Sequence, residues 1–199
     1  MVHPPKFTLE QYFAYDGLFE FRLEYHAGRI LPVEIPDNHH RLAFLNVTIE
    51  IRRRLEDEYT TVFENQRLKP APEHYIYADV ALVRDLPQFV DERVDTLLNA
   101  RAIVEISSPA SWPHDSVTKG DLYRQMPGCL EYWLIHCEEV KAEHWIRTGA
   151  SQWRIQYIED PKAVFALETL GIEFPLALAY RGSGLVEVQA RSSHDDPSE

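Results

Sequence analysis

Two short apolar stretches each carry one acidic side chain: residues 75–83 have the sequence YIYADVALV, and residues 100–107 have the sequence ARAIVEIS. Both are rich in β-branched and aromatic residues, which is typical of strands in a sheet covered on both faces. The stretches TTVFEN (residues 60–65) and EYWLIHC (residues 131–137) have the same character. The four stretches together predict a β-sheet at the core of the protein.

Three segments around these strands predict helices. Thr8 and Gln11 have the spacing of a capping box, which predicts a short helix near the start of the chain. Residues 39–58 follow a stop and cap at residues 36–38 and place apolar side chains at helical spacing. Those side chains form two strips, Leu42, Leu45 and Ile49 in one and Phe44, Ile51 and Leu55 in the other. Residues 116–126, closed by Pro127 and Gly128, predict a crossover helix.

Two hairpins extend this pattern. Residues 19–35 alternate apolar and polar side chains around a turn at residues 26–28, and the alternation places Glu24 on the more polar face. Residues 141–149 and 151–158 predict a C-terminal hairpin that adds to the sheet after the strand at 131–137. Glu131, at the start of that strand, could be a third acid of the site, but a surface position at the strand end is the stronger expectation. The fold class is therefore α/β, with a mixed central sheet flanked by helices.

Length and composition fit one compact domain. The chain has 199 residues, of which 45% are hydrophobic, and this suits a single domain at residues 1–185 with a substantial core. Residues 186–199 are polar, have no apolar periodicity and are expected to form a disordered acidic tail. Cys129 and Cys137 lack the spacing of a zinc site and are expected to be buried thiols.

Charge and targeting signals narrow the classes of function. No apolar run is long enough to span a bilayer and the first residues lack a secretory pattern, so we expect a cytoplasmic protein with no membrane partner. The net charge is -12, from 20 basic and 32 acidic side chains, which argues against a general nucleic-acid binder. Any nucleic-acid activity would need a local basic face, a metal ion or both.

Asp79 and Glu105 are the informative residues, because ionised carboxylates are seldom buried without a partner or a metal. For either acid alone, an edge position or an ion pair with Arg or Lys is the simpler explanation. Together, two acids on adjacent strands can share Mg²⁺, which takes one or two protein carboxylates and keeps waters and phosphates as its other ligands. Lys119, near the start of the crossover helix, could stabilise charge on a phosphate. This combination predicts a metal-dependent nuclease.

Several ordered motifs resemble the Uma2 family of restriction-endonuclease-like proteins, in the PD-(D/E)XK nuclease superfamily. The resemblance runs from about residue 7 to residue 157. It is carried by FRLEYHAGRI (residues 21–30), YIYADVALV, AIVEISSPAS (residues 102–111) and DSVTKGDLYRQMPGCLEYWLIH (residues 115–136). The family pattern implies a restriction-endonuclease-like fold and nuclease activity.

The resemblance also implies roles for individual residues. Asp79 and Glu105 would bind the metal, helped by the backbone carbonyl of Ile106, and Lys119 would be a migrated catalytic lysine. Glu24 would be an auxiliary acid that binds the metal or orients its water. Family members carry a histidine at the start of the long helix. Either His39 or His40 could fill that place, and the spacing to Leu42 slightly favours His39. Beside a helix N-terminus, a solvated or capping histidine is the simpler alternative.

The chain departs from the family pattern at several positions. Ser107 occupies the strand position of the superfamily lysine, and Ala78 replaces the proline of the Pro-Asp pair. His26 and Ala27 stand where the family usually has an apolar residue and an aspartate before the turn glycine. None of these changes removes a proposed catalytic group. They put substrate recognition in question more than the metal site.

The sequence therefore predicts an Mg²⁺-dependent endonuclease, with Mn²⁺ able to substitute, that hydrolyses phosphodiester bonds of nucleic acid, DNA in preference to RNA. A homodimer would suit an enzyme that cuts both strands, although no sequence feature defines an interface. The main alternative is a catalytically degenerate family member that keeps the fold as a non-enzymatic interaction module, which the acidic net charge favours. A third hypothesis is that the site acts on a small or single-stranded phosphodiester.

Overall fold

The computed structural model describes residues 6–55, 60–90 and 95–186. Residues 187–199, almost all of the expected tail, lie outside these ranges. In chain order the elements are α1 (Leu9–Asp16), β1 (Leu23–His26), β2 (Arg29–Pro32), α2 (Asn38–Arg54), β3 (Thr60–Ala71), β4 (His74–Arg84), β5 (Thr96–Leu97), β6 (Ala102–Ser107), η1 (His114–Lys119), α3 (Gly120–Gln125), β7 (Glu131–His136), β8 (Ala142–Arg147), β9 (Trp153–Ile158), β10 (Val164–Leu167), β11 (Ile172–Pro175) and η2 (Leu176–Tyr180).

The central sheet is mixed, as predicted. Its main path runs β2-β1-β4-β6-β7-β8-β9, and β3 pairs with β4 and β5. β6 and β7 are parallel, whereas β4 and β6 are antiparallel. Parallel neighbours need a crossover connection, and η1 followed by α3 supplies it. The predicted C-terminal hairpin is present as β8 and β9, and a second hairpin, β10 and β11, follows it.

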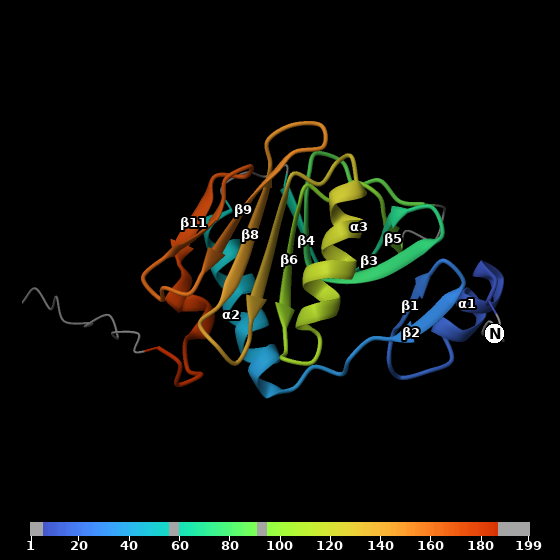
Figure 1. Cartoon of the computed structure of the whole chain (residues 1–199), viewed down its shortest axis with the longest axis horizontal. Coiled ribbons are helices and arrows are strands. Elements are labelled where there is room, and N and C mark those ends of the chain that lie inside the picture. The colour runs from blue at the N-terminus through green and yellow to red at the C-terminus, as the bar shows by residue number, and fades with distance from the viewer. Residues whose placement is uncertain (1–5, 56–59, 91–94, 187–199) are drawn as a thin grey trace, which may run out of the picture.

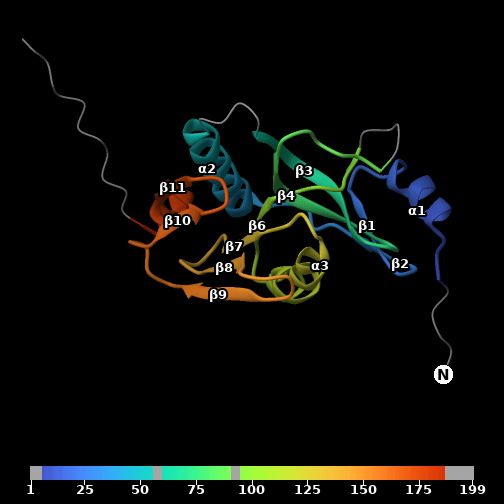
Figure 2. The same cartoon turned by 90° about the horizontal axis from the view of Figure 1, so that it is seen from above.

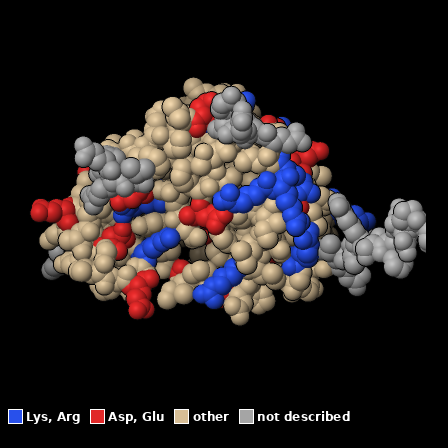
Figure 3. Space-filling model, turned by 180° about the vertical axis from the view of Figure 1, so that it is seen from behind, with Lys and Arg blue, Asp and Glu red and all other residues tan. Residues whose placement is uncertain are grey.

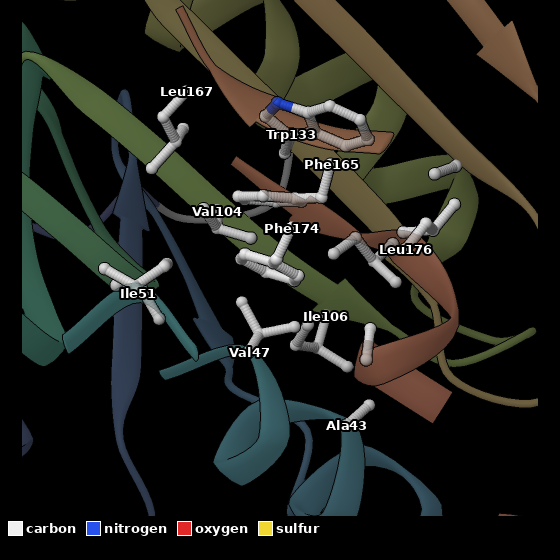
Figure 4. Packing of buried hydrophobic residues seen from close by; sticks show 14 of the residues in the cluster. Ala43, Val47, Ile51, Val104, Ile106, Trp133, Phe165, Leu167, Phe174 and Leu176 are labelled. Atoms are coloured by element: carbon white, nitrogen blue, oxygen red, sulfur yellow. The ribbon is translucent and has the colours of Figure 1, made fainter. Parts of the chain in front are cut away.

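The sheet lies between two layers. α2, η2 and the β10–β11 hairpin cover one face, and α3 covers the other (Figures 1 and 2). Side chains alternate accordingly: Val80 and Leu82 pack on the α2 side, and Ala81 and Val83 pack on the α3 side. Figure 4 shows the α2-side core, where Phe165 of β10 packs against the aromatic ring of Trp133.

The buried face of α2 differs from the prediction. Ala43, Val47 and Ile51 face the sheet and are almost fully buried. Leu45 and Ile49, which the helical spacing assigned to a packed strip, are 53% and 43% exposed. Small and β-branched residues let the helix lie close to the sheet, and this packing turns the larger leucine strip toward solvent.

The predicted helix signals are found at their expected positions. Thr8 and Gln11 form the capping box of α1, and Asp37 caps α2 by accepting a hydrogen bond from the His40 amide at 2.8 Å. The crossover helix begins earlier than predicted, with a π-helical turn at His114–Lys119. Within the described ranges, no helix combines the length and apolar character needed to cross a bilayer.

Glu131 is not at the surface, contrary to expectation. It is fully buried, and its carboxylate accepts hydrogen bonds from the backbone amides of Glu168 and Thr169 at 2.9 and 3.0 Å. His144 lies 2.7 Å from the same carboxylate. Glu131 therefore joins the start of β7 to the loop between β10 and β11. Cys129 and Cys137 are buried free thiols, as predicted.

Candidate active site

Asp79 and Glu105 lie where β4 and β6 separate. The last recorded pair of this antiparallel ladder is Val80 with Val104. Beyond this pair, a backbone amide of each strand donates to a carboxylate side chain and not to a backbone carbonyl of the opposite strand. The Ile106 amide donates to Asp79 Oδ2 at 2.8 Å, and the Asp79 amide donates to Glu105 Oε2 at 3.1 Å. The two predicted acids are therefore neighbours, held by backbone donors at one end of the sheet.

The backbone amide and carbonyl of Ile106 face Asp79 on β4. In an extended strand the N–H and C=O of one residue face the same neighbouring strand. Because the Ile106 amide bonds to Asp79, its carbonyl also faces β4. Among the described contacts of the Asp79 carboxylate, all use Oδ2, which leaves Oδ1 for a ligand.

Lys119 reaches this site from the crossover helix. Its Nζ donates to the Tyr77 carbonyl at 2.8 Å and lies 3.2 Å from Glu105 Oε1. It also lies 3.4 Å from Glu24 Oε1 and 3.5 Å from Asp115 Oδ1. Burial alone would lower the pKa of Lys119, but the surrounding carboxylates outweigh it and raise the pKa well above its ordinary value. The amine is therefore a fixed positive charge.

Glu105 is held by donors on both oxygens. Tyr123 OH donates to Oε1 at 2.5 Å, beside the contact with Lys119, while Oε2 accepts the Asp79 amide. Burial raises the pKa of Glu105 well above its ordinary value, and the nearby charges of Asp79 and Asp115 raise it further, against the opposing effect of Lys119. This carboxylate is in an environment that disfavours its charge unless another cation is present.

Glu24 is buried at the same site, although it belongs to the first hairpin. Its Oε1 accepts the Tyr77 amide at 3.0 Å, and its Oε2 lies 3.0 Å from His26 Nε2 and 3.3 Å from His114 Nε2. Burial would raise the pKa of Glu24, but Lys119 and the hydrogen bonds from His114, His26 and Tyr77 together lower it far below its ordinary value. The polar face predicted for β1 thus turns inward, toward the catalytic candidates.

Of the two candidate histidines, the structure brings His40 to the site. Its Nε2 lies 3.2 Å from Asp79 Oδ2. Burial would lower the pKa of His40, but the hydrogen bond and charge of Asp79 raise it above its ordinary value. His39, which the spacing slightly favoured, is exposed at the start of α2 and does not line the cavity. One residue along a helix turns a side chain by about 100°, which single-residue spacing arguments cannot resolve.

These groups line one open cavity of about 830 Å³. Its polar lining at this end comprises Glu24, His40, Asp79, Glu105, His114, Asp115 and Lys119, with Ile106 beside them. Asp115, His114, His26 and Tyr123 were not among the predicted site residues. Asp115 carried a usable signal, because it stands four residues before Lys119 and so shares a helix face with it.

The charges in the cavity do not balance. Four carboxylates, those of Glu24, Asp79, Glu105 and Asp115, line this end of the cavity with one ammonium group, that of Lys119. Lys119 contacts three of them, Glu24, Glu105 and Asp115. Asp79 contacts His40, and Glu24 also contacts two imidazoles. Buried like charges repel strongly when water is excluded. A set of carboxylate oxygens and a backbone carbonyl is the donor set that hard divalent cations prefer, so these residues fit a metal such as Mg²⁺.

The chain is similar to known proteins along most of its length. The family model Uma2, described as "Putative restriction endonuclease", matches residues 9–179. A protein from Synechocystis sp. (strain ATCC 27184 / PCC 6803 / Kazusa), named "Uncharacterized protein sll1609", is 31% identical over 133 residues, which are 65% of this chain and 75% of that protein.

A solved structure has the same fold. It is a "putative nuclease belonging to DUF820" from Anabaena variabilis ATCC 29413, which superposes with a TM-score of 0.67 at 16% sequence identity. The superposition covers 81% of this chain and 91% of that one. At this level of identity the likeness concerns the arrangement of helices and strands, which agrees with the predicted restriction-endonuclease-like fold.

Proposed function

The chain belongs to the Uma2 family, and on that premise we propose that it is a metal-dependent nuclease that hydrolyses phosphodiester bonds of nucleic acid, with DNA as the favoured substrate. The observation that carries the proposal is the excess of carboxylate charge around Lys119 in an open cavity. A single buried lysine cannot neutralise four acids, and a phosphate would be repelled from them without a further cation.

Asp79, Glu105 and the Ile106 carbonyl are the groups that would hold a divalent ion. The three residues are linked by backbone-to-carboxylate hydrogen bonds where β4 and β6 separate, and oxygen donors of this kind suit Mg²⁺, with Mn²⁺ as a substitute. When bound, such an ion polarises a phosphoryl oxygen and makes a coordinated water more acidic.

The protein's own groups would then position the substrate and balance its charge. Lys119 is held by the Tyr77 carbonyl and by carboxylates, so its ammonium has a defined position from which it can stabilise charge that develops on phosphoryl oxygens. Tyr123 and the Asp79 amide orient Glu105, and His40 and the Ile106 amide orient Asp79. In this role Tyr123 and His40 are positioning residues.

The test combines cleavage with direct measurement of metal binding. We expect Asp79→Asn and Glu105→Gln to lose DNA cleavage in Mg²⁺ by a factor of about 100 or more. Calorimetric Mg²⁺ affinity should fall by at least about tenfold in both variants, because each removes a charged ligand. Lys119→Met should lose cleavage to a similar degree but retain Mg²⁺ binding.

Glu159→Gln is the matched control, since Glu159 is exposed and lies away from the cavity, and it should keep both properties. Unchanged cleavage in Asp79→Asn or Glu105→Gln would sink the proposed mechanism. If the wild-type protein binds neither Mg²⁺ nor Mn²⁺ and cleaves no nucleic acid, the degenerate interaction module is the better explanation. Running duplex DNA, single-stranded DNA, RNA and a small phosphodiester in parallel identifies the substrate class.

A further inference from the structure

A second group of metal-ligand residues lies beside the proposed active site. Glu24 on β1, His26 at the end of β1 and His114 at the start of η1 offer ligand atoms that all lie within 4.8 Å of one another. Glu24 Oε2 is 3.0 Å from His26 Nε2 and 3.3 Å from His114 Nε2. His26 and His114 were assigned no function by the motifs that indicated a nuclease.

The spacing of these atoms suits ligands of one ion. Two ligand atoms that are each about 2.1 Å from a metal are separated by about 3.0 Å at a right angle and about 3.4 Å at a tetrahedral angle. The two distances between Glu24 and the imidazoles fall at these values. The same two distances also suit hydrogen bonds, and the ligand atoms of all three residues lie within 4.8 Å of one another, so an ion could take the place of the imidazole protons between these side chains.

The three side chains are held in place, and one of them, His114, is accessible. Glu24 is anchored through its other oxygen, Oε1, by the Tyr77 amide and Lys119, which leaves Oε2 directed at the imidazoles. His26 sits in the β-ladder opposite Arg29 and His74, next to a tight turn in which Ala27 and Gly28 have φ of 48° and 95°. The side chain of His114 is 33% exposed and lines the cavity, so solvent or a ligand can reach an open coordination position.

The ligand atoms of Glu24, His26 and His114 favour a different class of metal than the carboxylates of Asp79 and Glu105 do. Two imidazole nitrogens and one carboxylate suit borderline transition metals, and His₂Glu with an open position is a known catalytic zinc set. Mg²⁺ prefers oxygen ligands and near-ideal octahedral geometry. We propose that Glu24, His26 and His114 form a second cation site, which binds a borderline divalent transition metal of the Zn²⁺ type.

This site would link the first hairpin to the crossover helix. Glu24 would bind the ion through Oε2 while its Oε1 contacts Lys119. An ion in the second site would therefore stabilise the carboxylate that contacts the proposed catalytic lysine. The inference extends the proposed function through Glu24, but binding of the ion to the three ligands does not require nuclease activity.

The experiment is calorimetric titration of Zn²⁺ into the full chain, followed by the same titration of His26→Gln and His114→Gln. We expect the wild-type protein to show a Zn²⁺ site that weakens at least tenfold in each variant, while Mg²⁺ binding is retained. Asp79→Asn should show the reverse pattern, with Mg²⁺ binding lost and this Zn²⁺ site kept. A shift of thermal unfolding with Zn²⁺ provides a second measurement that does not depend on catalysis.

His39→Gln is the matched control, because it removes an exposed imidazole outside the cavity and should leave the Zn²⁺ affinity unchanged. The proposal is overturned if the wild type shows no Zn²⁺ site, or if both His variants bind Zn²⁺ as tightly as the control. Should His26→Gln fail to fold, the partly exposed His114 decides the outcome alone. Failure of Mg²⁺ binding with an intact Zn²⁺ site would count against the nuclease proposal and not against this one.

Discussion

Lys119 occupies the site from a helix, while the strand position two residues after Glu105 holds Ser107. Ser107 Oγ donates to Asp115 Oδ2 at 2.8 Å, and Asp115 in turn lies beside Lys119. The strand residue therefore supports the carboxylate that helps to hold the lysine. The positive charge of Lys119 thus enters the cavity from the crossover helix and not from β6, because the lysine side chain is long enough to span that distance.

Glu50 shows a buried acid whose role is structural. It is 3% exposed, and its carboxylate pairs with Arg53 and Arg54 on α2 and with Arg181 beyond η2. Burial alone would raise the pKa of Glu50, but Arg54 and Arg181 lower it below its ordinary value. Glu50 thus ties α2 to the C-terminal part of the described chain.

We expect Glu50→Gln to reduce the free energy of unfolding at neutral pH by about 1 to 3 kcal/mol, because buried charge-assisted hydrogen bonds are lost. A lowered pKa in the folded state contributes stability above the pKa of the unfolded chain, about 4.5, and loses it as the pH falls through the folded value. Urea denaturation at pH 7 and at pH 4 should show the difference between wild type and variant shrinking in acid. A difference that stays constant with pH would contradict this assignment.

At the scale of elements, α1 and the β1–β2 hairpin form one side of the site. Tyr12 of α1 is fully buried, and its hydroxyl donates to the Leu23 carbonyl at 2.9 Å. Tyr25 and Tyr75 pack against the same ring. Because Glu24 lies between Leu23 and Tyr25, the order of α1 supports the position of this carboxylate.

Thr8→Ala removes the side chain that caps α1 and should cost about 1 kcal/mol of stability. The loss should be concentrated in α1 and β1, so amide hydrogen exchange in these elements should accelerate more than in β6 and β7. Thr8→Ser keeps the hydroxyl and should restore most of the protection. Equal acceleration across the sheet would show that α1 is not an independently sensitive element.

The π-helical turn η1 supplies several side chains of the site. η1 carries His114, Asp115 and Lys119, all of which line the cavity. π-helical turns are rare and occur often at functional sites. Here the widened turn starts the crossover helix earlier than the sequence predicts and brings His114 to the same cavity as Lys119.

At the scale of the whole molecule, the β10–β11 hairpin completes the core on the α2 side. Phe174 is 2% exposed, and its ring stacks on that of Phe165 with centroids 4.5 Å apart. Phe174→Ala should destabilise the protein by about 3 to 5 kcal/mol, because it leaves a cavity in a packed layer. Chemical denaturation measures this loss.

Val164→Ala, on the same hairpin, is the control and should change stability little, since Val164 is 51% exposed. Phe174 does not line the cavity, so the folded fraction of Phe174→Ala should bind Mg²⁺ as the wild type does. Altered Mg²⁺ affinity in the folded variant would mean that the hairpin positions the site as well as the core.

The molecule also has an uneven charge distribution despite its net charge of -12. Basic side chains gather on the face shown in Figure 3, and Arg52 and Arg53 of α2 are 52% and 64% exposed. Arg52 pairs with Glu64, and three arginines share the single carboxylate of Glu50. This local excess of positive charge is the kind of surface that an acidic protein needs to meet a phosphate backbone.

The sequence by itself determined several elements of this protein, because apolar runs, caps and turn residues act over a few neighbouring positions. The strands at 75–83 and 102–107, the cap at Thr8 and the turn before Gly28 were all predictable in this way. Asp79 and Glu105 could be selected from the sequence because a charge within an apolar strand needs compensation.

Tertiary structure alone decided which groups meet. Glu24, Asp79 and Lys119 come from β1, β4 and η1, and their contacts depend on strand register and on the depth at which each element packs. The same packing selected His40 in place of His39, buried Glu131 and turned Leu45 to solvent. Local patterns specify the shape of each element, but the rotation and position of an element against its neighbours arise only when the whole core is assembled.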